Sequence, residues 1–152
     1  STSSLQEATL LKQQWSDIGV NLNIEQIDSA TASANWSALN YEVYFSYLTS
    51  DMTDTSELAG LWCVYDSTQC WGSGWNDDRQ EEAEELVQKA ATEMDEEKRM
   101  EYYCQMQEIV AEEVPNIPLY NSSFYIAHTD KISNLVQTPL GNYRFETLTK
   151  AQ

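Results

Sequence analysis

Residues 41–51 read Tyr41-Glu-Val-Tyr-Phe-Ser-Tyr-Leu-Thr-Ser-Asp51, and this stretch decides which fold the sequence predicts. Alternate positions place four large side chains on one face of a strand: Tyr41, Val43, Phe45 and Tyr47. Tyr44 and Leu48 add apolar bulk to the other face, a pattern typical of a central strand that is covered on both sides. In α/β sheets, ligands bind beyond the carboxyl ends of such strands. We therefore expect a binding site at the polar residues 49–51.

The residues before this stretch predict a helix, a strand and a second helix. Apolar residues recur at helical spacing from Leu5 to Ile18, and Gly19 provides the left-handed conformation that ends a helix. Residues 20–25 alternate between apolar and polar, which predicts a strand. Residues 29–39 form the next expected helix, capped by Ser29 or Thr31. Two strands that flank a helix indicate a parallel β-α-β crossover, so the expected fold class is α/β.

The residues after this stretch predict further helices followed by extended chain. Capping explains the polar residues 51–57, which lead into a short helix around Leu58, and two long helices follow with Asn76 and Asp95 as their caps. The expected buried stripes of the long helices are Ala83, Leu86, Val87, Ala90 and Met94 in the first, and Met100, Tyr103, Met106, Val110 and Val114 in the second. Four extended segments complete the chain: 117–120, 124–128, 132–136 and 143–145.

Composition bounds the class of protein and its partners. A chain of 152 residues has the size of one domain, and 41% hydrophobic residues argue against disorder. A formal net charge of −17 disfavours nucleic acid and anionic membranes as partners, because like charges repel. Solubility is the simplest meaning of this charge. No apolar run approaches the roughly 20 residues that a membrane-spanning helix needs.

Three cysteines bear on the redox environment. Cys63 and Cys70 lie in a turn-rich segment and could form a disulfide, which would require an oxidising compartment; two reduced thiols are the alternative. A small-loop disulfide of this kind stabilises a fold by about 2 to 3 kcal/mol. Cys104 lies within a helical pattern and is expected to be a buried, inert thiol.

No pattern in the sequence predicts a metal, a cofactor or a catalytic centre. Residues 51–62 superficially resemble a calcium loop, but Ser56 stands where glycine is needed and Trp62 where glutamate is needed. The many glutamates of residues 81–113 come without a histidine at ligand spacing, so they predict solvated helix faces. His128, the one histidine, lies in an apolar pattern and is interpreted as structural.

Three passages together resemble the carboxyl-terminal part of the family 5 extracytoplasmic solute-binding proteins, which serve oligopeptide and dipeptide ABC transporters. The first two are Leu11-Lys-Gln-Gln-Trp-Ser-Asp-Ile-Gly-Val-Asn-Leu-Asn-Ile-Glu25 and Asn40-Tyr-Glu-Val-Tyr-Phe45. The third and most specific is Asp95-Glu-Glu-Lys-Arg-Met-Glu-Tyr-Tyr-Cys-Gln-Met-Gln-Glu-Ile-Val-Ala-Glu-Glu-Val-Pro-Asn-Ile-Pro-Leu-Tyr120.

The resemblance implies that residues 1–152 form one α/β lobe of a type II periplasmic-binding-protein-like fold, a mixed sheet flanked by helices. Family members have a strand before the first helix, where this chain has only residues 1–4, so the sheet is expected to lack a strand or to borrow one. The full-length protein would be extracytoplasmic, in the periplasm or at the cell surface, and lipid-anchored. Its partners would be a peptide or another small solute and an ABC transporter permease.

The resemblance also implies where cargo would bind. In relatives that bind peptides, an aspartate just after the cleft strand neutralises the peptide amino group, and that place falls on Ser50 or, one residue later, on Asp51. Backbone groups beside it pair with the peptide. Trp36 matches a position where some relatives place an aromatic ring over the cargo, with ordinary helix packing as the alternative. The expected ligand-binding residues are Trp36, Tyr47, Leu48, Thr49, Ser50 and Asp51.

The leading functional hypothesis is a non-enzymatic binding lobe that captures a solute, most simply a peptide, for import. One alternative is a small secreted hydrolase that uses a carboxylate pair, which requires two buried acids with separated pKa values. Another is a secreted adhesion or signalling module, suggested by the glycosylation triplets Asn35-Trp-Ser37 and Asn121-Ser-Ser123.

Overall fold

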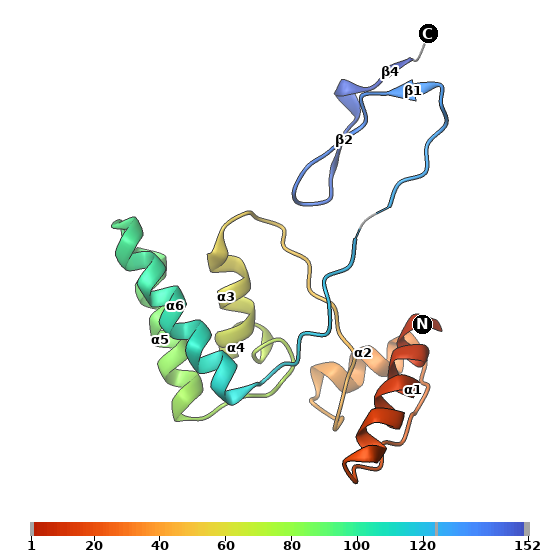
Figure 1. Ribbon diagram of the computed structural model, residues 1–152. Coiled ribbons are helices and arrows are strands. Elements are labelled where there is room, and N and C mark those ends of the chain that lie inside the picture. The colour runs from red at the N-terminus through yellow and green to blue at the C-terminus, as the bar shows by residue number, and fades with distance from the viewer. Residues whose placement is uncertain (1, 124, 151–152) are drawn as a thin grey trace. The chain divides into compact units, whose positions relative to one another are not determined.

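The computed structural model describes residues 2–123 and 125–150 (Figure 1). The chain divides into two compact units, residues 1–47 and residues 48–152. Helices dominate both units, and the second also contains two small antiparallel sheets. The chain is thus a mixture of helices and small sheets, which agrees with the α/β class at this coarse level.

The first unit contains the two helices that the sequence predicts. Helix α1 spans Thr2–Asp17, and Gly19 follows it with a left-handed φ of +84°. Helix α2 spans Ser29–Ser37, and its cap is Asp28, not Ser29 or Thr31. The Asp28 carboxylate accepts hydrogen bonds from the backbone N–H groups of residues 30 and 31, both at 3.0 Å. An aspartate satisfies the free N–H groups of a first helical turn as well as serine does, so the cap is one residue earlier.

The prediction of a strand on each side of α2 is wrong. Residues 20–25 and 41–48 have irregular backbone, so the expected β-α-β crossover is not formed in the described residues. Val43 is 54% exposed and Tyr47 is 84% exposed, whereas a central strand would bury them. A strand needs a hydrogen-bonded neighbouring strand for its N–H and C=O groups, and the sheets of the described residues, β1 with β4 and β2 with β3, do not include residues 20–25 or 41–48. The missing or borrowed strand remains a prediction.

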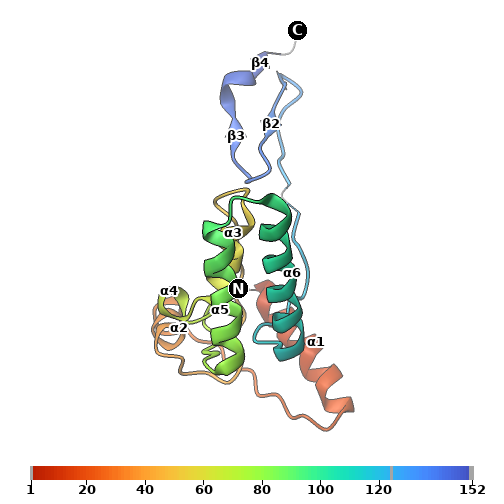
Figure 2. The same ribbon diagram turned by 90° about the vertical axis from the view of Figure 1, so that its left-hand side faces the viewer.

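The second unit is built on packed helices. These are α3 (Thr55–Cys63), α4 (Tyr65–Thr68), α5 (Asp78–Thr92) and α6 (Glu96–Glu113). Helices α5 and α6 pack along each other, and α3 packs against α5 (Figure 2). Their contact faces form one apolar core: Ala59, Cys63, Ala83, Leu86, Val87, Ala90, Tyr103, Met106 and Ile109.

The predicted stripes of α5 and α6 are correct in their centres and wrong at their ends. Met94 is 95% exposed because α5 stops at Thr92. Met100 and Val114 of the second stripe are also exposed, whereas Ile109, which the predicted stripe left out, is buried. Cys104 is exposed, so its predicted burial is wrong.

The predicted caps of these two helices give one success and one correction. Asp95 caps α6 as predicted, with its carboxylate accepting from the N–H groups of residues 97 and 98. Asp77 replaces the predicted Asn76 as the cap of α5, and its carboxylate accepts from the N–H groups of residues 79 and 80. A cap position is therefore recognisable from sequence to within one residue here.

The carboxyl-terminal segment is less regular than the sequence predicts. Strand β1 (Ile132–Ser133) pairs with β4 (Thr149–Lys150), and β2 (Val136–Gln137) pairs with β3 (Tyr143–Arg144), both antiparallel. A 3-10 turn, η1, spans Phe145–Thr147. Residues 117–120 and 125–128 are irregular, and Phe124 lies outside the described residues. No described residue from 114 to 150 is buried, so nothing in this segment supplies a core against which longer strands would form.

Candidate functional site

The loop of residues 49–54, which enters α3, holds the residues that the sequence singles out for binding. Thr49 and Asp51 are exposed, and Ser50 is half-buried. The exposed Asp51 carboxylate is a polar group of the kind that fixes the orientation of a ligand. The structure thus places Thr49, Ser50 and Asp51 together in one short loop.

Glu57, in the first turn of α3, holds this loop in place. Its carboxylate accepts hydrogen bonds from the Ser50 hydroxyl at 2.6 Å, from the Asp51 N–H at 2.9 and 3.0 Å, and from the Met52 N–H at 2.9 Å. The Ser50 hydroxyl also lies against the Met52 carbonyl oxygen. These donors lower the pKa of Glu57, with the Ser50 hydroxyl contributing most. The Ser50 hydroxyl is therefore engaged within the chain, and Asp51 carries the exposed carboxylate.

Asp54 ties the same loop to α6. Its carboxylate caps α3 by accepting from the Ser56 N–H at 2.8 Å, which confirms the predicted capping role of this polar run. The Arg99 guanidinium donates to both Asp54 carboxylate oxygens, at 2.5 and 2.6 Å. Arg99 also lies over the ring of the buried Tyr103, 5.7 Å from its centroid. The loop is therefore attached at both ends to the helices that form the core.

Asp54→Asn is expected to lower thermal stability at neutral pH and to have no effect in strong acid. The Arg99 guanidinium, followed by the Ser56 N–H, holds the pKa of the Asp54 carboxyl well below its usual value of 3.8. A depressed pKa stabilises the folded state above that usual value, and the stabilisation is lost as pH falls through the folded pKa. Asparagine still caps a helix, so the variant removes mainly the Arg99 pair. Melting curves from pH 7 to pH 2 should show the difference shrink progressively below about pH 4; a constant difference over this range would contradict this.

The other predicted ligand-binding residues are divided between the two units. Trp36 is half-buried in α2, and Tyr47 is the last residue of the first unit. Leu48 is half-buried at the start of the second unit, next to the 49–54 loop. Sequence reasoning missed Glu57 as the residue that holds the loop. The available signal was an acidic residue in the first turn of a helix that directly follows a polar loop.

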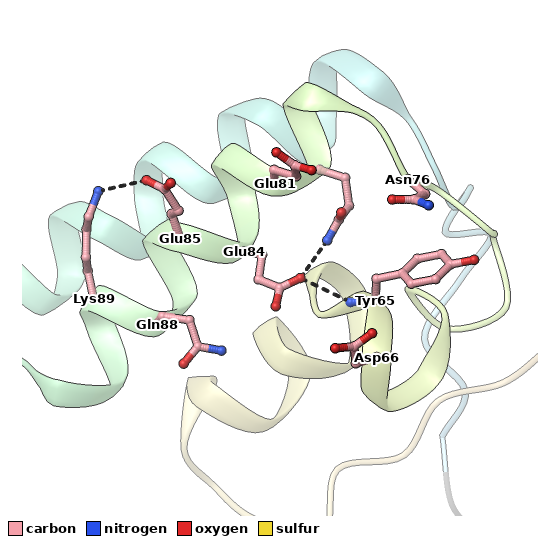
Figure 3. Close-up of a pocket in the computed structure, with 9 residues that line it drawn as sticks. Tyr65, Asp66, Asn76, Glu81, Glu84, Glu85, Gln88 and Lys89 are labelled. Carbon is pink, nitrogen blue, oxygen red and sulfur yellow. Dashed lines mark hydrogen bonds and ion pairs between the residues drawn. The ribbon is translucent and has the colours of Figure 1, made fainter.

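A hollow of about 550 Å³ lies beside α4 and α5, and acidic side chains surround it (Figure 3). Glu84 accepts hydrogen bonds from the Tyr65 N–H at 3.3 Å and from Gln80 Nε2 at 2.8 Å. The buried Gln80 also donates to the Cys63 carbonyl oxygen at 2.6 Å, so this network joins α5 to the end of α3. None of the acids that line this hollow is buried, so it lacks the buried carboxylate pair that the hydrolase hypothesis requires.

A smaller hollow of about 280 Å³ lies in the carboxyl-terminal segment. Its lining is apolar apart from His128: Ile126, Ile132, Leu135, Tyr143, Phe145 and Leu148. His128 is exposed, and its Nδ1 atom lies 3.0 Å from the Thr129 carbonyl oxygen. Among the described residues, no group of histidines, cysteines or acids is arranged to hold a metal ion. No helix in the described part of the chain is both long and apolar enough to cross a membrane.

Cys63 and Cys70 are free thiols in the structure, and both side chains are completely buried. Burial, aided by nearby Cys70 and Glu84, raises the pKa of Cys63 to about 12. Burial and Glu84 raise the pKa of Cys70 to about 11. Gln69, Cys70 and Trp71 all have the left-handed φ of 52° that side chains rarely adopt, which marks a strained turn. The disulfide between the two cysteines remains a prediction.

Iodoacetamide is expected to modify Cys104 at least about tenfold faster than Cys63 or Cys70 in the folded protein, because the thiolate is the reactive form and Cys104 alone is exposed. Peptide mapping after timed alkylation measures the three rates, and alkylation in denaturant is the control. Rapid labelling of Cys63 or Cys70 before unfolding would contradict the described burial. Persistent protection of both cysteines in denaturant without reductant would show that they form the predicted disulfide.

Comparison with known proteins gives a consistent set of relatives, although no protein-family model matches the chain. Over 145 residues the chain is 26% identical to the probable ABC transporter periplasmic-binding protein SapA of Escherichia coli K12, covering 94% of this chain and 26% of that protein. Over 150 residues it is 25% identical to the peptide transport periplasmic protein SapA of Salmonella typhimurium, covering 97% of this chain and 27% of that protein. The chain thus spans about a quarter of the length of these relatives, and nearly all of it is similar to these two periplasmic proteins.

Proposed function

We propose that the chain is one lobe of an extracytoplasmic solute-binding protein that captures peptides for an ABC importer. One observation carries the proposal: the similarity to two periplasmic proteins extends over 94% and 97% of the chain, and one of them is named for peptide transport. One relative is named as a periplasmic binding protein and the other as a peptide transport protein, which supports a binding role rather than catalysis. The resemblance to the family 5 solute-binding proteins, carried by residues 11–25, 40–45 and 95–120, agrees with this class.

The proposed capture mechanism uses the 49–54 loop as an anchor for the peptide amino group. The exposed carboxylate of Asp51 neutralises that group, and this role falls to Asp51 because the Ser50 hydroxyl is already bonded to Glu57. The family resemblance adds Trp36, Tyr47, Leu48 and Thr49 to the proposed ligand contacts. A second lobe supplies the remaining contacts when the protein closes by a hinge motion, so the isolated chain binds cargo weakly.

The same proposal places residues 1–152 in a single lobe of a longer, lipid-anchored protein in the periplasm or at the cell surface. Its partners are the peptide and the permease of the importer. Nucleic acid is not a partner, because a formal charge of −17 repels a phosphate backbone.

Native mass spectrometry of the protein purified from its own cells tests this function. The expected result is a polypeptide considerably longer than 152 residues that carries peptides and releases them on denaturation. Sequencing of the released material identifies the cargo. A native polypeptide of only this length, or a longer one whose released cargo contains no peptide, would contradict the proposal.

A further inference from the structure

Three hydrogen-bond donors of the 49–54 loop converge on one carboxylate of the chain itself. The Ser50 hydroxyl and the N–H groups of Asp51 and Met52 all donate to Glu57, at 2.6 to 3.0 Å. Successive backbone N–H groups that point to one side form a concave donor set, and such sets bind anions. The anion is here supplied internally, from the first turn of α3.

The occupied donor set determines which charge the loop can offer to a ligand. The N–H groups of Asp51 and Met52 and the Ser50 hydroxyl are directed at Glu57, so this donor set is not available to a ligand carboxylate. The exposed Asp51 carboxylate is the charged group that the loop presents. A loop in this state attracts a cationic group and repels an anionic one.

We propose that Glu57 is a positioning residue that sets the polarity of peptide binding, by filling the donor set of the loop so that Asp51 meets the amino end of the cargo and not its carboxyl end. This inference rests on the proposed function, because it assigns how the same loop selects one end of a peptide. Glu57 acts through Asp51 and does not itself touch the cargo.

The substitution Glu57→Gln tests the proposed role because it keeps the length of the side chain and removes its negative charge. Oε2 of Glu57 accepts three hydrogen bonds and Oε1 accepts one. Glutamine has the same length but only one acceptor oxygen, and its NH₂ group would face the donors of the loop. The loop should then lose its fixed conformation. Glu108→Gln is the matched control, since Glu108 is an exposed glutamate on α6 outside this network.

Calorimetric titration of the native protein with trialanine and with N-acetyl-trialanine is the test. The dissociation constant for N-acetyl-trialanine divided by that for trialanine measures selectivity for a free amino group. We expect Glu57→Gln to lower this ratio at least tenfold, on the order of one lost charge-assisted contact, and Glu108→Gln to leave it unchanged. In an Asp51→Asn background, Glu57→Gln should cause no further loss of selectivity. If Glu57 had a purely structural role, Glu57→Gln would weaken the binding of both peptides equally and leave the ratio unchanged.

Amide hydrogen exchange without ligand gives an independent result. Exchange at Asp51 and Met52 should accelerate in Glu57→Gln and remain slow in Glu108→Gln. If Glu57→Gln keeps full selectivity for the free amino group and the wild type binds peptide, the role of Glu57 is overturned and the proposed function stands. A wild type that binds neither peptide would overturn the proposed function and this assignment with it. Unchanged exchange at both amides in Glu57→Gln would show that Glu57 does not hold the loop, and would overturn the inference without affecting peptide capture.

Discussion

Asp51→Asn is expected to weaken binding of an unblocked tripeptide to the native protein by about 30-fold or more. Removing one partner of a hydrogen-bonded charge pair that is enclosed on binding costs about 2 to 5 kcal/mol. The substitution keeps the size of the side chain and removes its charge. The Asp51 N–H remains available to Glu57, so the loop should keep its conformation.

An N-acetylated peptide is the control for the Asp51 prediction. Acetylation removes the positive charge, so the wild type should bind this peptide weakly and Asp51→Asn should bind it no worse. Titration calorimetry with both peptides measures the effect. An equal loss of affinity for both peptides, or no loss for either, would mean that Asp51 does not pair with the amino group.

Leu86→Ala is expected to destabilise the second unit by about 2 to 4 kcal/mol, because truncating a buried leucine removes apolar contacts and leaves a cavity. Leu86 is 8% exposed in the core that α3, α5 and α6 share. The matched control is Leu58→Ala in α3, where the leucine is 39% exposed. That change should cost less than about 1 kcal/mol. Urea denaturation followed by circular dichroism at 222 nm gives both values, and similar midpoints for the two variants would contradict this description of the core.

The helices were predictable because their signals are local. The spacing of Ala83, Leu86 and Ala90 defines a buried face within one helix. Asp95 satisfies the N–H groups of the turn that follows it. The ends of the helices were less predictable. Met94 continues the apolar spacing of α5, but it lies beyond Thr92, where the helix stops.

The strands were not predictable in the same way, because a strand depends on its neighbour. Residues 41–48 have the alternation of a central strand, yet they are irregular in the described chain. Side-chain pattern indicates which face a strand would bury, but backbone pairing requires a second segment that the pattern does not identify.

The position of the candidate loop can be read from the sequence, whereas the hydrogen bonds within the loop cannot. The pattern of residues 41–48 followed by polar residues directs attention to Ser50 and Asp51. The proposed choice of Asp51 rests on the hydrogen bond between the Ser50 hydroxyl and the Glu57 carboxylate, seven residues further along the chain. Glu57 reaches back to the loop only because α3 begins where it does, at Thr55 after the Asp54 cap. Such a contact follows from three-dimensional geometry and has no distinct sequence pattern.

Calorimetry on two forms of the protein tests the central proposal most directly. The native protein and the isolated 152-residue chain are each titrated with the same unblocked peptide. A lobe that supplies about half of the contacts should bind weakly or not at all alone, while the native protein binds tightly. Tight peptide binding by the 152 residues alone would contradict the proposal that they form one lobe of a two-lobed binding protein.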